Sequence, residues 1–359
     1  MQSAFYDPII TYEENYKNGP PIFSQDATPP ARNIIKNYKF LGFDVNLPFG
    51  IPPGPLLNSE FMKAAFEWGF DVSTYKTVRT DEFPCHPFPN VLYVNTDGDL
   101  HPDKTPRLVA RNQTDKPNEE ISITNSFGVP SRRSSIWQED VRKALGYVGD
   151  GQLMILSFMG TVRENQSQQE FISDFAKAGR LSVETGVKVV EANLSCPNIG
   201  NEGLVCYNAE VTEAVCRAIR KEIGDTPLIL KIGYYKDSAQ LGKIAKIVNE
   251  YADAVAAINT LQIEVVNEKG EQALPGKNRL KSGVCGASIK WAGLEMVSQL
   301  NEIRKVNNYK FEIVGIGGVM KPGDYFEYRK AGADCVQSAT GAMWNAHLAN
   351  QIFDRKQGI

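Results

Sequence analysis

The sequence lacks the usual marks of membrane proteins and metalloproteins. It has no apolar stretch approaching the roughly 18 residues of a membrane span, and its N-terminus has neither the basic nor the apolar region of a signal peptide. Its three histidines show no paired spacing, and its six cysteines form no CxxC pair. These absences argue against a histidine metal site, a zinc ribbon or an iron–sulfur cluster. We therefore expect no bound metal and no membrane partner.

The sequence also lacks an excess of charge of either sign. The net charge is −3, which favours neither nucleic acid nor an anionic membrane surface as a partner. Scattered free thiols fit a reducing compartment, so we expect a cytoplasmic protein. The hydrophobic fraction of 42% over 359 residues is enough for a large globular core.

Short apolar runs alternate with helical patterns after residue 45. The expected strands are residues 54–58, 72–78, 153–158, 187–193, 228–232, 254–260, 312–316 and 335–339, with helices such as 169–185, 210–223, 238–251 and 288–306 between them. Fully apolar strands flanked by amphipathic helices indicate a parallel sheet covered by helices. Eight such units predict an α/β fold, a (β/α)8 TIM barrel, although counting alone does not separate it from a doubly wound sheet.

Two domain-level features accompany the barrel. Residues 1–45 have little periodicity, so we expect an N-terminal extension packed on a barrel domain of residues 46–359. The connections 79–151 and 262–287 are too long for ordinary loops and carry β-hairpin signals, including Asp97-Gly98. We expect these excursions to lie over the C-terminal face of the barrel.

Polar residues gather at the predicted strand ends, where barrel active sites lie. A strand at 187–193 leads into Asn193, Ser195, Cys196 and Asn198, and other ends carry Lys76, Lys231 and Asn259-Thr260. Amides can bind a flat polar ring, and a thiol can exchange a proton. A buried lysine at a strand end is costly unless it faces an anion or a reacting group. Lys231 is therefore a cation beside an anionic cofactor or the nucleophile of a Schiff-base aldolase.

The last two strands end in glycine-rich turns. GIGGV (residues 315–319) and SATGA (residues 338–342) allow close approach of backbone N–H groups to an anion. Loops after the seventh and eighth strands are the usual phosphate site of such barrels. The pair therefore predicts a phosphate-bearing ligand.

The motif NLSCPN (residues 193–198), with GIGGV and SATGA downstream, resembles the dihydroorotate dehydrogenase family of FMN-dependent (β/α)8 barrels over about residues 50–350. The segment ITNSFGVPS (residues 123–131) is similar to the substrate loop of that family. The resemblance implies oxidation of (S)-dihydroorotate to orotate in pyrimidine biosynthesis, with FMN as cofactor. It also implies a homodimer, and a redox partner subunit is possible.

The resemblance also assigns roles to individual residues. It makes Cys196 the catalytic base, as in the soluble class of the family, with Lys231 and Lys76 as further catalytic residues against the flavin. The implied substrate ligands are Asn125, Phe127, Gly128, Asn193, Asn198, Asn259 and Thr260. The implied cofactor ligands are Asn58, Lys76, Lys231, Gly283, Gly317, Gly318, Ala339 and Thr340.

The sequence departs from the family pattern in ways that bear on the substrate. Asn90 stands where the family usually has an arginine, Ala339 replaces a usual glycine, and NSEF (residues 58–61) replaces a small-residue stretch near the flavin. The loop after Cys196 is closer to that of dihydropyrimidine dehydrogenase, which usually has histidine at the position of Asn198. The alternative substrate is thus an uncharged dihydropyrimidine of the dihydrouracil type.

Overall fold

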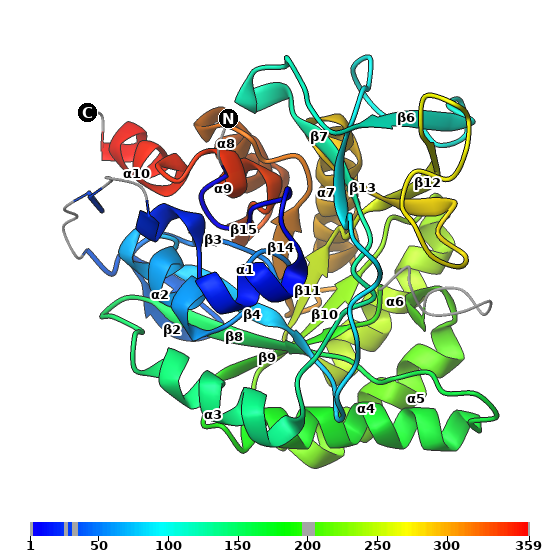
Figure 1. Ribbon diagram of the computed structural model, residues 1–359. Helices are drawn as coiled ribbons and strands as arrows, with labels where there is room; N and C mark the ends of the chain where they lie inside the picture. Colours follow the sequence, from blue (N-terminus) through cyan, green and yellow to red (C-terminus); the bar gives the residue numbers. More distant parts are fainter. Residues whose placement is uncertain (1–2, 25–27, 31–34, 196–204, 358–359) are drawn as a thin grey trace.

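The structure is a computed structural model that describes residues 3–24, 28–30, 35–195 and 205–357 (Figure 1). Eight parallel strands form one sheet in the order β3-β15-β14-β11-β10-β9-β8-β4. They are β3 (Phe49–Gly50), β4 (Val72–Val78), β8 (Leu153–Phe158), β9 (Val189–Asn193), β10 (Leu228–Ile232), β11 (Ala254–Ala257), β14 (Glu312–Ile316) and β15 (Cys335–Gln337). With helices between the strands, this is the (β/α)8 barrel expected from the sequence.

The first and second strands of the barrel meet where the sheet closes. The backbone N–H of Thr74 donates to the carbonyl of Ile51 at 2.8 Å, which joins the chain after β3 to β4. A glycine is needed at position 50, because a Cβ there would overlap the carbonyl of Val72. The carboxyl ends of all eight strands therefore lie together around one end of the barrel.

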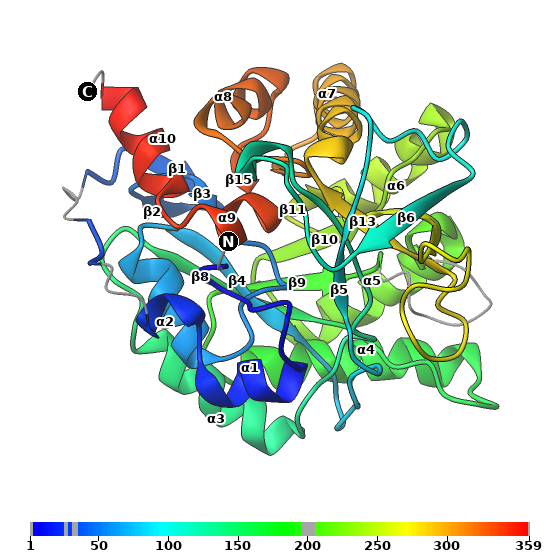
Figure 2. The same cartoon turned by 45° about the horizontal axis from the view of Figure 1, so that its top comes forward.

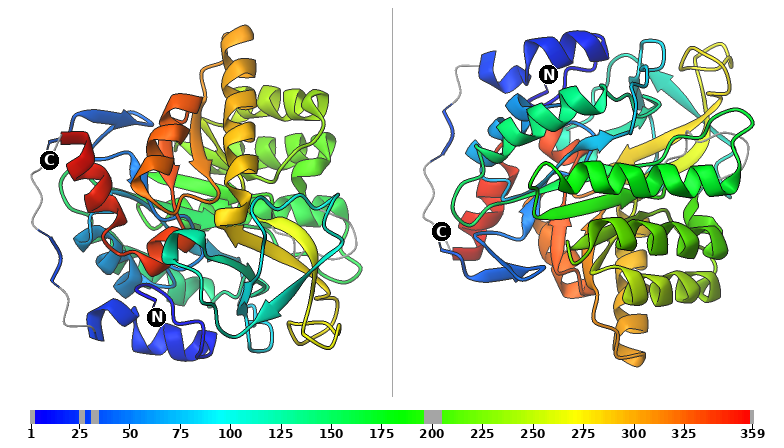
Figure 3. Two further views of the ribbon diagram at one scale, coloured as in Figure 1. Left: turned by 90° about the horizontal axis from the view of Figure 1, so that it is seen from above. Right: turned by 90° about the horizontal axis from the view of Figure 1, so that it is seen from below.

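The helices form the outer layer around the strands (Figure 3). They are α2 (Ser59–Glu67), α3 (Ser134–Leu145), α4 (Gln168–Val183), α5 (Ala209–Ile223), α6 (Ser238–Tyr251), α7 (Lys290–Val306), α8 (Pro322–Ala331), α9 (Thr340–Trp344) and α10 (Leu348–Gln357), with short 3-10 turns at Asn118–Glu120, Val205–Tyr207 and Ala287–Ile289. Ser167, Asn208 and Asp237 accept backbone hydrogen bonds as N-caps of α4, α5 and α6, so the sequence itself sets where these helices begin. In the described residues no helix is long and apolar enough to cross a membrane.

The barrel interior is apolar at its amino-terminal end. Val72, Val189 and Ile229 pack there with Phe40 and Val45, which come from the hairpin of β1 (Tyr38–Phe40) and β2 (Phe43–Val45). The hairpin covers this end, where the backbone of its Leu41 turn donates to the carboxylate of Glu312 at the start of β14 at 2.9 Å. Ligand access is therefore confined to the opposite, carboxyl end.

The two long connections together build a second, smaller barrel. Its strands are β5 (Val91–Val94), β6 (Arg107–Arg111), β7 (Ser122–Asn125), β12 (Leu261–Val266) and β13 (Lys281–Gly286), closed in the order β12-β13-β7-β5-β6. Figures 1 and 2 show the strands from the two connections side by side. The sequence predicts hairpins in these connections, but it does not reveal that they close on each other.

The first barrel strand lies earlier than expected. The sequence pattern places it at residues 54–58, whereas β3 is Phe49–Gly50 and residues 52–55, Pro-Pro-Gly-Pro, follow it as a loop. Prolines lack the N–H that a central strand must donate, which excludes this stretch from the sheet. The N-terminal residues form α1 (Tyr12–Asn18) and a 3-10 turn at Pro21–Ser24, which lie against the barrel (Figure 2).

Candidate functional site

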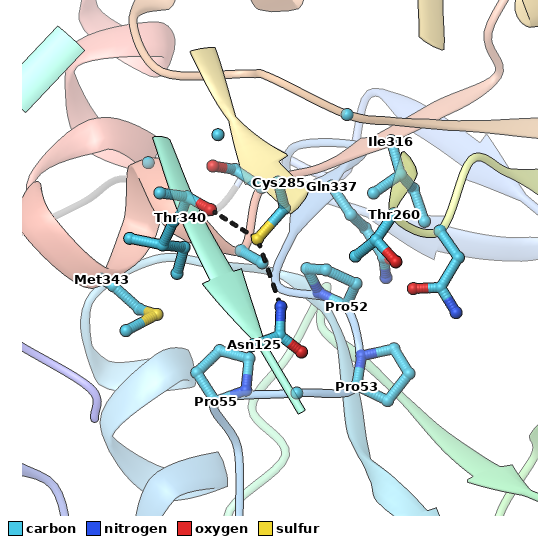
Figure 4. A pocket seen from close by; sticks show the side chains of 18 of the residues that line it. Pro52, Pro53, Pro55, Asn125, Thr260, Cys285, Ile316, Gln337, Thr340 and Met343 are labelled. Carbon is cyan, nitrogen blue, oxygen red and sulfur yellow. Dashed lines mark hydrogen bonds between the residues drawn. The ribbon is translucent and has the colours of Figure 1, made fainter. Parts of the chain in front are cut away.

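A cavity opens at the carboxyl ends of the barrel strands, between the main barrel and the second barrel (Figure 4). The barrel loops contribute its floor, and β7 and β13 contribute one wall. It is lined by these sequence-predicted residues: Lys76, Asn125, Phe127, Asn193, Lys231, Asn259, Thr260, Gly317, Gly318, Ala339 and Thr340. Residues far apart in the sequence are thus brought to one place.

Two of the predicted residues, Cys196 and Asn198, lie outside the described residues. The strand end that leads to them is described: the backbone N–H of Ser195 donates to Asn193 Oδ1 at 3.2 Å. Across the barrel, Asn259 Nδ2 donates to the carbonyl of Ser195 at 2.9 Å. These bonds fix the chain on the amino side of Cys196 at the edge of the cavity.

Asn58, predicted as a cofactor ligand, does not line the cavity. It is the N-cap of α2: its Oδ1 accepts from the backbone of Glu60 at 3.1 Å, and its Nδ2 donates to the carbonyl of Tyr16 at 2.9 Å. Both ends of the amide are therefore used inside the protein. The residues of the loop before α2 that line the cavity are Pro52, Pro53, Gly54 and Pro55.

Two predicted glycines also lie off the cavity surface. Gly128 follows Phe127 in the substrate-loop segment, and its carbonyl accepts from Arg79 Nη2 at 3.0 Å. Gly283 pairs with Asn125 inside the second barrel and packs against Thr260. The β13 glycine that lines the cavity is Gly286. Gly128 and Gly283 support neighbours that reach the cavity.

The cavity wall contains a thiol that sequence reasoning missed. Cys285, on β13, accepts from Asn125 Nδ2 and from Thr340 Oγ1, each at 3.4 Å (Figure 4). Burial raises the pKa of this thiol, so it is a neutral contact. It lies where a predicted substrate ligand and a predicted phosphate ligand meet. The glycines on both sides of it in SGVCG were the only sequence signal of its position.

A chain of buried polar groups crosses the barrel floor. The hydroxyl of Thr77, on β4, hydrogen-bonds that of Ser157, on β8, at 3.0 Å, and Ser157 donates to the Glu191 carboxylate, on β9, at 3.0 Å. Lys231, on the adjacent β10, is almost fully buried. Burial raises the pKa of Glu191 and lowers that of Lys231, and the attraction between the two charges opposes both shifts. The fold thus holds a carboxyl and an amine where each is costly to ionise.

We expect Glu191→Gln to raise the free energy of unfolding of the cofactor-free protein at pH 7, because burial makes the ionised Glu191 carboxylate costly even with Lys231 beside it. Because the native pKa of Glu191 lies above the unfolded one, wild-type stability is highest below the unfolded pKa and falls as the pH rises through the native pKa. The variant should lack this fall, so the two proteins should converge in acid. Urea unfolding across pH measures the difference. A variant less stable than wild type at pH 7 would contradict it.

Two buried side-chain oxygens on the cavity lack a hydrogen-bond partner among the described residues. Within the described part of the chain, Thr260 Oγ1 and Gln337 Oε1 make no hydrogen bond, and both residues line the cavity (Figure 4). The amide of Gln337 is fixed because its Nε2 donates to Thr74 Oγ1 and to the carbonyl of Val72, both at 3.0 Å. Buried polar atoms are normally paired, so the cavity fits a ligand that donates a hydrogen bond to Gln337 Oε1 and exchanges one with the Thr260 hydroxyl.

The glycine turns after β14 and β15 form the far end of the cavity. Gly317 and Gly318 have positive φ angles of 126° and 63°. The Ser338 hydroxyl donates to the carbonyl of Val319 at 2.6 Å and ties the two turns together. A backbone cradle of this kind, without side chains in the way, fits an anionic group such as a phosphate.

This site defines the class of protein: a (β/α)8-barrel enzyme whose cavity combines amides, two buried lysines and two glycine-rich turns. The chain belongs to the dihydroorotate dehydrogenase family, whose profile, described as dihydroorotate dehydrogenase, matches residues 39–355. This is a family of oxidoreductases, so the Schiff-base aldolase considered from the sequence is set aside.

Several curated proteins are similar to the chain. A dihydroorotate dehydrogenase of Dictyostelium discoideum is 36% identical over 362 residues, covering 97% of this chain and 96% of that protein. The catalytic subunit of an NAD(+)-dependent dihydroorotate dehydrogenase B of Brachyspira hyodysenteriae is 30% identical, covering 51% of this chain and 58% of that protein. The subunit PreA of the NAD-dependent dihydropyrimidine dehydrogenase of Escherichia coli K12 is also 30% identical, covering 57% and 51%.

Proposed function

We propose that the protein oxidises (S)-dihydroorotate to orotate with FMN as cofactor, as a step of pyrimidine biosynthesis. One observation carries the proposal: Asn125, Asn193, Asn259 and Thr260 converge with Lys231 on one cavity of a dihydroorotate dehydrogenase family barrel. Amide and hydroxyl groups match the ring carbonyl and N–H groups of a dihydropyrimidine. The near full-length similarity to the Dictyostelium enzyme supports the same substrate.

The residues present fit FMN. The unpaired Oε1 of Gln337 fits a ligand with an N–H donor. The glycine cradle fits a ligand with an anionic end. Lys76, Lys231 and Gln337 would hold the flavin ring, and Gly317, Gly318, Ala339 and Thr340 the phosphate. When bound, the flavin supplies the acceptor for the hydride that leaves the substrate.

The protein's own side chains then have distinct tasks. Cys196 removes the proton from C5 of the dihydropyrimidine ring, while Asn125, Phe127, Asn193, Asn198, Asn259 and Thr260 hold the ring against the flavin. Lys231 places a positive charge beside the flavin, where it stabilises negative charge that develops during the reaction. Its lowered pKa is consistent with an enclosed site, in which such a charge acts strongly.

An uncharged dihydropyrimidine is the second candidate substrate, favoured by the similarity to PreA and by the state of Asn90. Asn90 stands where the family usually has an arginine, and its Nδ2 is bound to the carbonyls of His86, Pro87 and Ser126 at 3.0, 3.3 and 3.2 Å. It therefore shapes the loop and offers no cation to a substrate carboxylate.

Anaerobic flavin bleaching decides between the two substrates. We expect dihydroorotate to reduce the bound flavin faster than dihydrouracil does. The reason is that the NSFGVPS loop and Asn198 follow the dihydroorotate dehydrogenase pattern. Stopped-flow absorbance with each substrate in parallel measures both rates. Reduction by dihydrouracil about tenfold faster than by dihydroorotate would reverse the assignment, and a protein that binds no flavin would overturn the proposed function.

The proposal extends to assembly and location. We expect a cytoplasmic homodimer, which light scattering of the purified protein tests. Two of the relatives are named as subunits, which supports a redox partner subunit linked to NAD as one electron acceptor, with fumarate as the other. Reoxidation of the reduced protein by fumarate alone would make the partner unnecessary.

A further inference from the structure

The N-terminal segment runs past α9 and α2 (Figures 1 and 2), and its Tyr6 lines the cavity. We call residues 3–24 the N-terminal strap. At one end, the hydroxyl of Ser3 and the backbone N–H of Ala4 donate to the carbonyl of Met343, a cavity-lining residue of α9, at 2.9 and 2.6 Å. Near its middle, Glu13 forms an ion pair with Arg132, which follows the substrate-loop segment. The strap is thus tied to both sides of the cavity.

Two tyrosines of the strap reach the site. Tyr6 lines the cavity, and its ring meets that of Phe127 edge-on, with centroids 5.4 Å apart. Tyr12, on α1, is only 5% exposed and also packs against Phe127, at 6.3 Å between centroids. The strap therefore packs directly on the loop that is proposed to contact the substrate.

Two of these rings, those of Tyr12 and Phe127, face a lysine proposed to lie against the flavin. Lys76 Nζ is 5.6 Å from the centroid of Tyr12 and 5.5 Å from that of Phe127. Lys76 is 7% exposed, so its ammonium meets these rings out of bulk water, where a cation–π contact is strongest. A lysine chain has four rotatable bonds, and a site that needs its charge at one point must restrict them.

We propose that Tyr12 is a positioning residue: with Phe127 it holds the Lys76 ammonium at the cavity, so the N-terminal strap is part of the active site. The inference rests on the proposed function for the task of Lys76, but the contact itself belongs to the protein without cofactor. Tyr6 closes the cavity wall on the same side. The strap and the substrate loop then set the position of Lys76 together.

The test compares Tyr12→Phe with Tyr12→Leu. Phenylalanine keeps the aromatic face, and leucine keeps apolar bulk without it. We expect Tyr12→Leu to weaken FMN binding by the cofactor-free protein, and to lower kcat/KM of the reconstituted enzyme, by about tenfold each, which is within the range of a desolvated cation–π contact. Tyr12→Phe should behave as wild type. Fluorescence titration with FMN measures the affinity without reference to turnover.

Two controls separate positioning from general damage to the strap. Tyr16→Leu removes a neighbouring ring of α1, tilted against that of Tyr12 with centroids 6.2 Å apart, and it should leave FMN affinity unchanged. In a Lys76→Met background, Tyr12→Leu should have no further effect on FMN affinity, because the cation is gone. Wild-type affinity in Tyr12→Leu, an equal loss in Tyr16→Leu, or a loss that persists without Lys76 would each overturn the inference.

Failure of the proposed function gives a different result. If the protein binds no FMN, thermal unfolding still reports whether the ring and the ammonium are coupled. The four proteins compared are wild type, Tyr12→Leu, Lys76→Met and the double variant. Coupling without FMN binding would retain the contact and refute the flavin assignment. Additive effects on the melting temperature would refute the contact.

Discussion

Replacing Cys196 by alanine is expected to slow reduction of the bound flavin by dihydroorotate by roughly 10²–10⁴-fold, the usual contribution of a positioned base. Folding and FMN content should be unchanged, since the sequence places this small side chain on a loop beyond β9. Cys196→Ser should also be slow at neutral pH, because a hydroxyl is a far weaker acid than a thiol of pKa about 8.5. Its rate should recover only towards alkaline pH. Stopped-flow reduction across pH measures all three proteins.

A matched thiol controls for the general effect of losing a cysteine. Cys206 is fully buried ten positions later, and burial raises its pKa to about 11. Cys206→Ala should therefore leave the rate of flavin reduction close to that of wild type. If Cys196→Ala also reduces its flavin at a near-normal rate, Cys196 is a packing residue, and the base must be sought elsewhere on the cavity wall.

The second large effect is expected at the glycine cradle. Gly318→Ala should weaken FMN binding by roughly 10²-fold. A left-handed alanine costs about 1–2 kcal/mol, and overpacking adds about 1–3 kcal/mol. At Gly318 φ is 63°, and a Cβ would lie 2.6 Å from the backbone nitrogen of Lys290. In the cofactor-free protein the turn can shift to relieve the clash. The proposed phosphate contact requires the unshifted position of the turn, so the cost falls on FMN binding. The purified variant should be colourless but folded by circular dichroism.

Gly323→Ala is the matched control, because a Cβ at this glycine, at the start of α8, would make only an ordinary contact, 3.8 Å from Arg355 Nη1. It should purify with the same FMN content as wild type. A yellow Gly318→Ala protein with full FMN content would move the phosphate site away from the cradle.

Local periodicity was enough to place most of the main barrel. The strands at 72–78, 153–158, 228–232 and 312–316 have the bounds expected from the sequence. They are almost entirely buried, and LMILSF, LILKI and EIVGI read as mostly apolar runs between helical patterns, whereas VSTYKTV is mixed. The first strand was misplaced because Phe49–Gly50 is too short to give such a run, and closure there depends on backbone contact with β4.

The residues of the candidate site also fall into those that the sequence predicts and those that it does not. Lys76, Asn193 and Lys231 could be predicted because they belong to or directly follow strands, and the barrel geometry alone brings strand ends together. Tyr6 and Cys285 could not, because one comes from the N-terminal strap and the other from the second barrel. Their positions depend on contacts between distant segments, and such pairings leave no period in the sequence.

The second barrel also bears on the order in which the protein folds. Arg107 on β6 pairs with Glu264 on β12, and Ile123 on β7 pairs with Cys285 on β13. Contacts so distant along the chain carry a high entropic cost of loop closure until the segments between them have folded. We expect the main barrel, built from neighbouring βα units, to form first and so to shorten those loops. The wall that carries Asn125 and Cys285 should then form late in folding. A cofactor that bridges this wall and the barrel floor binds only the completed fold, and mass action then favours that state over every partly folded one.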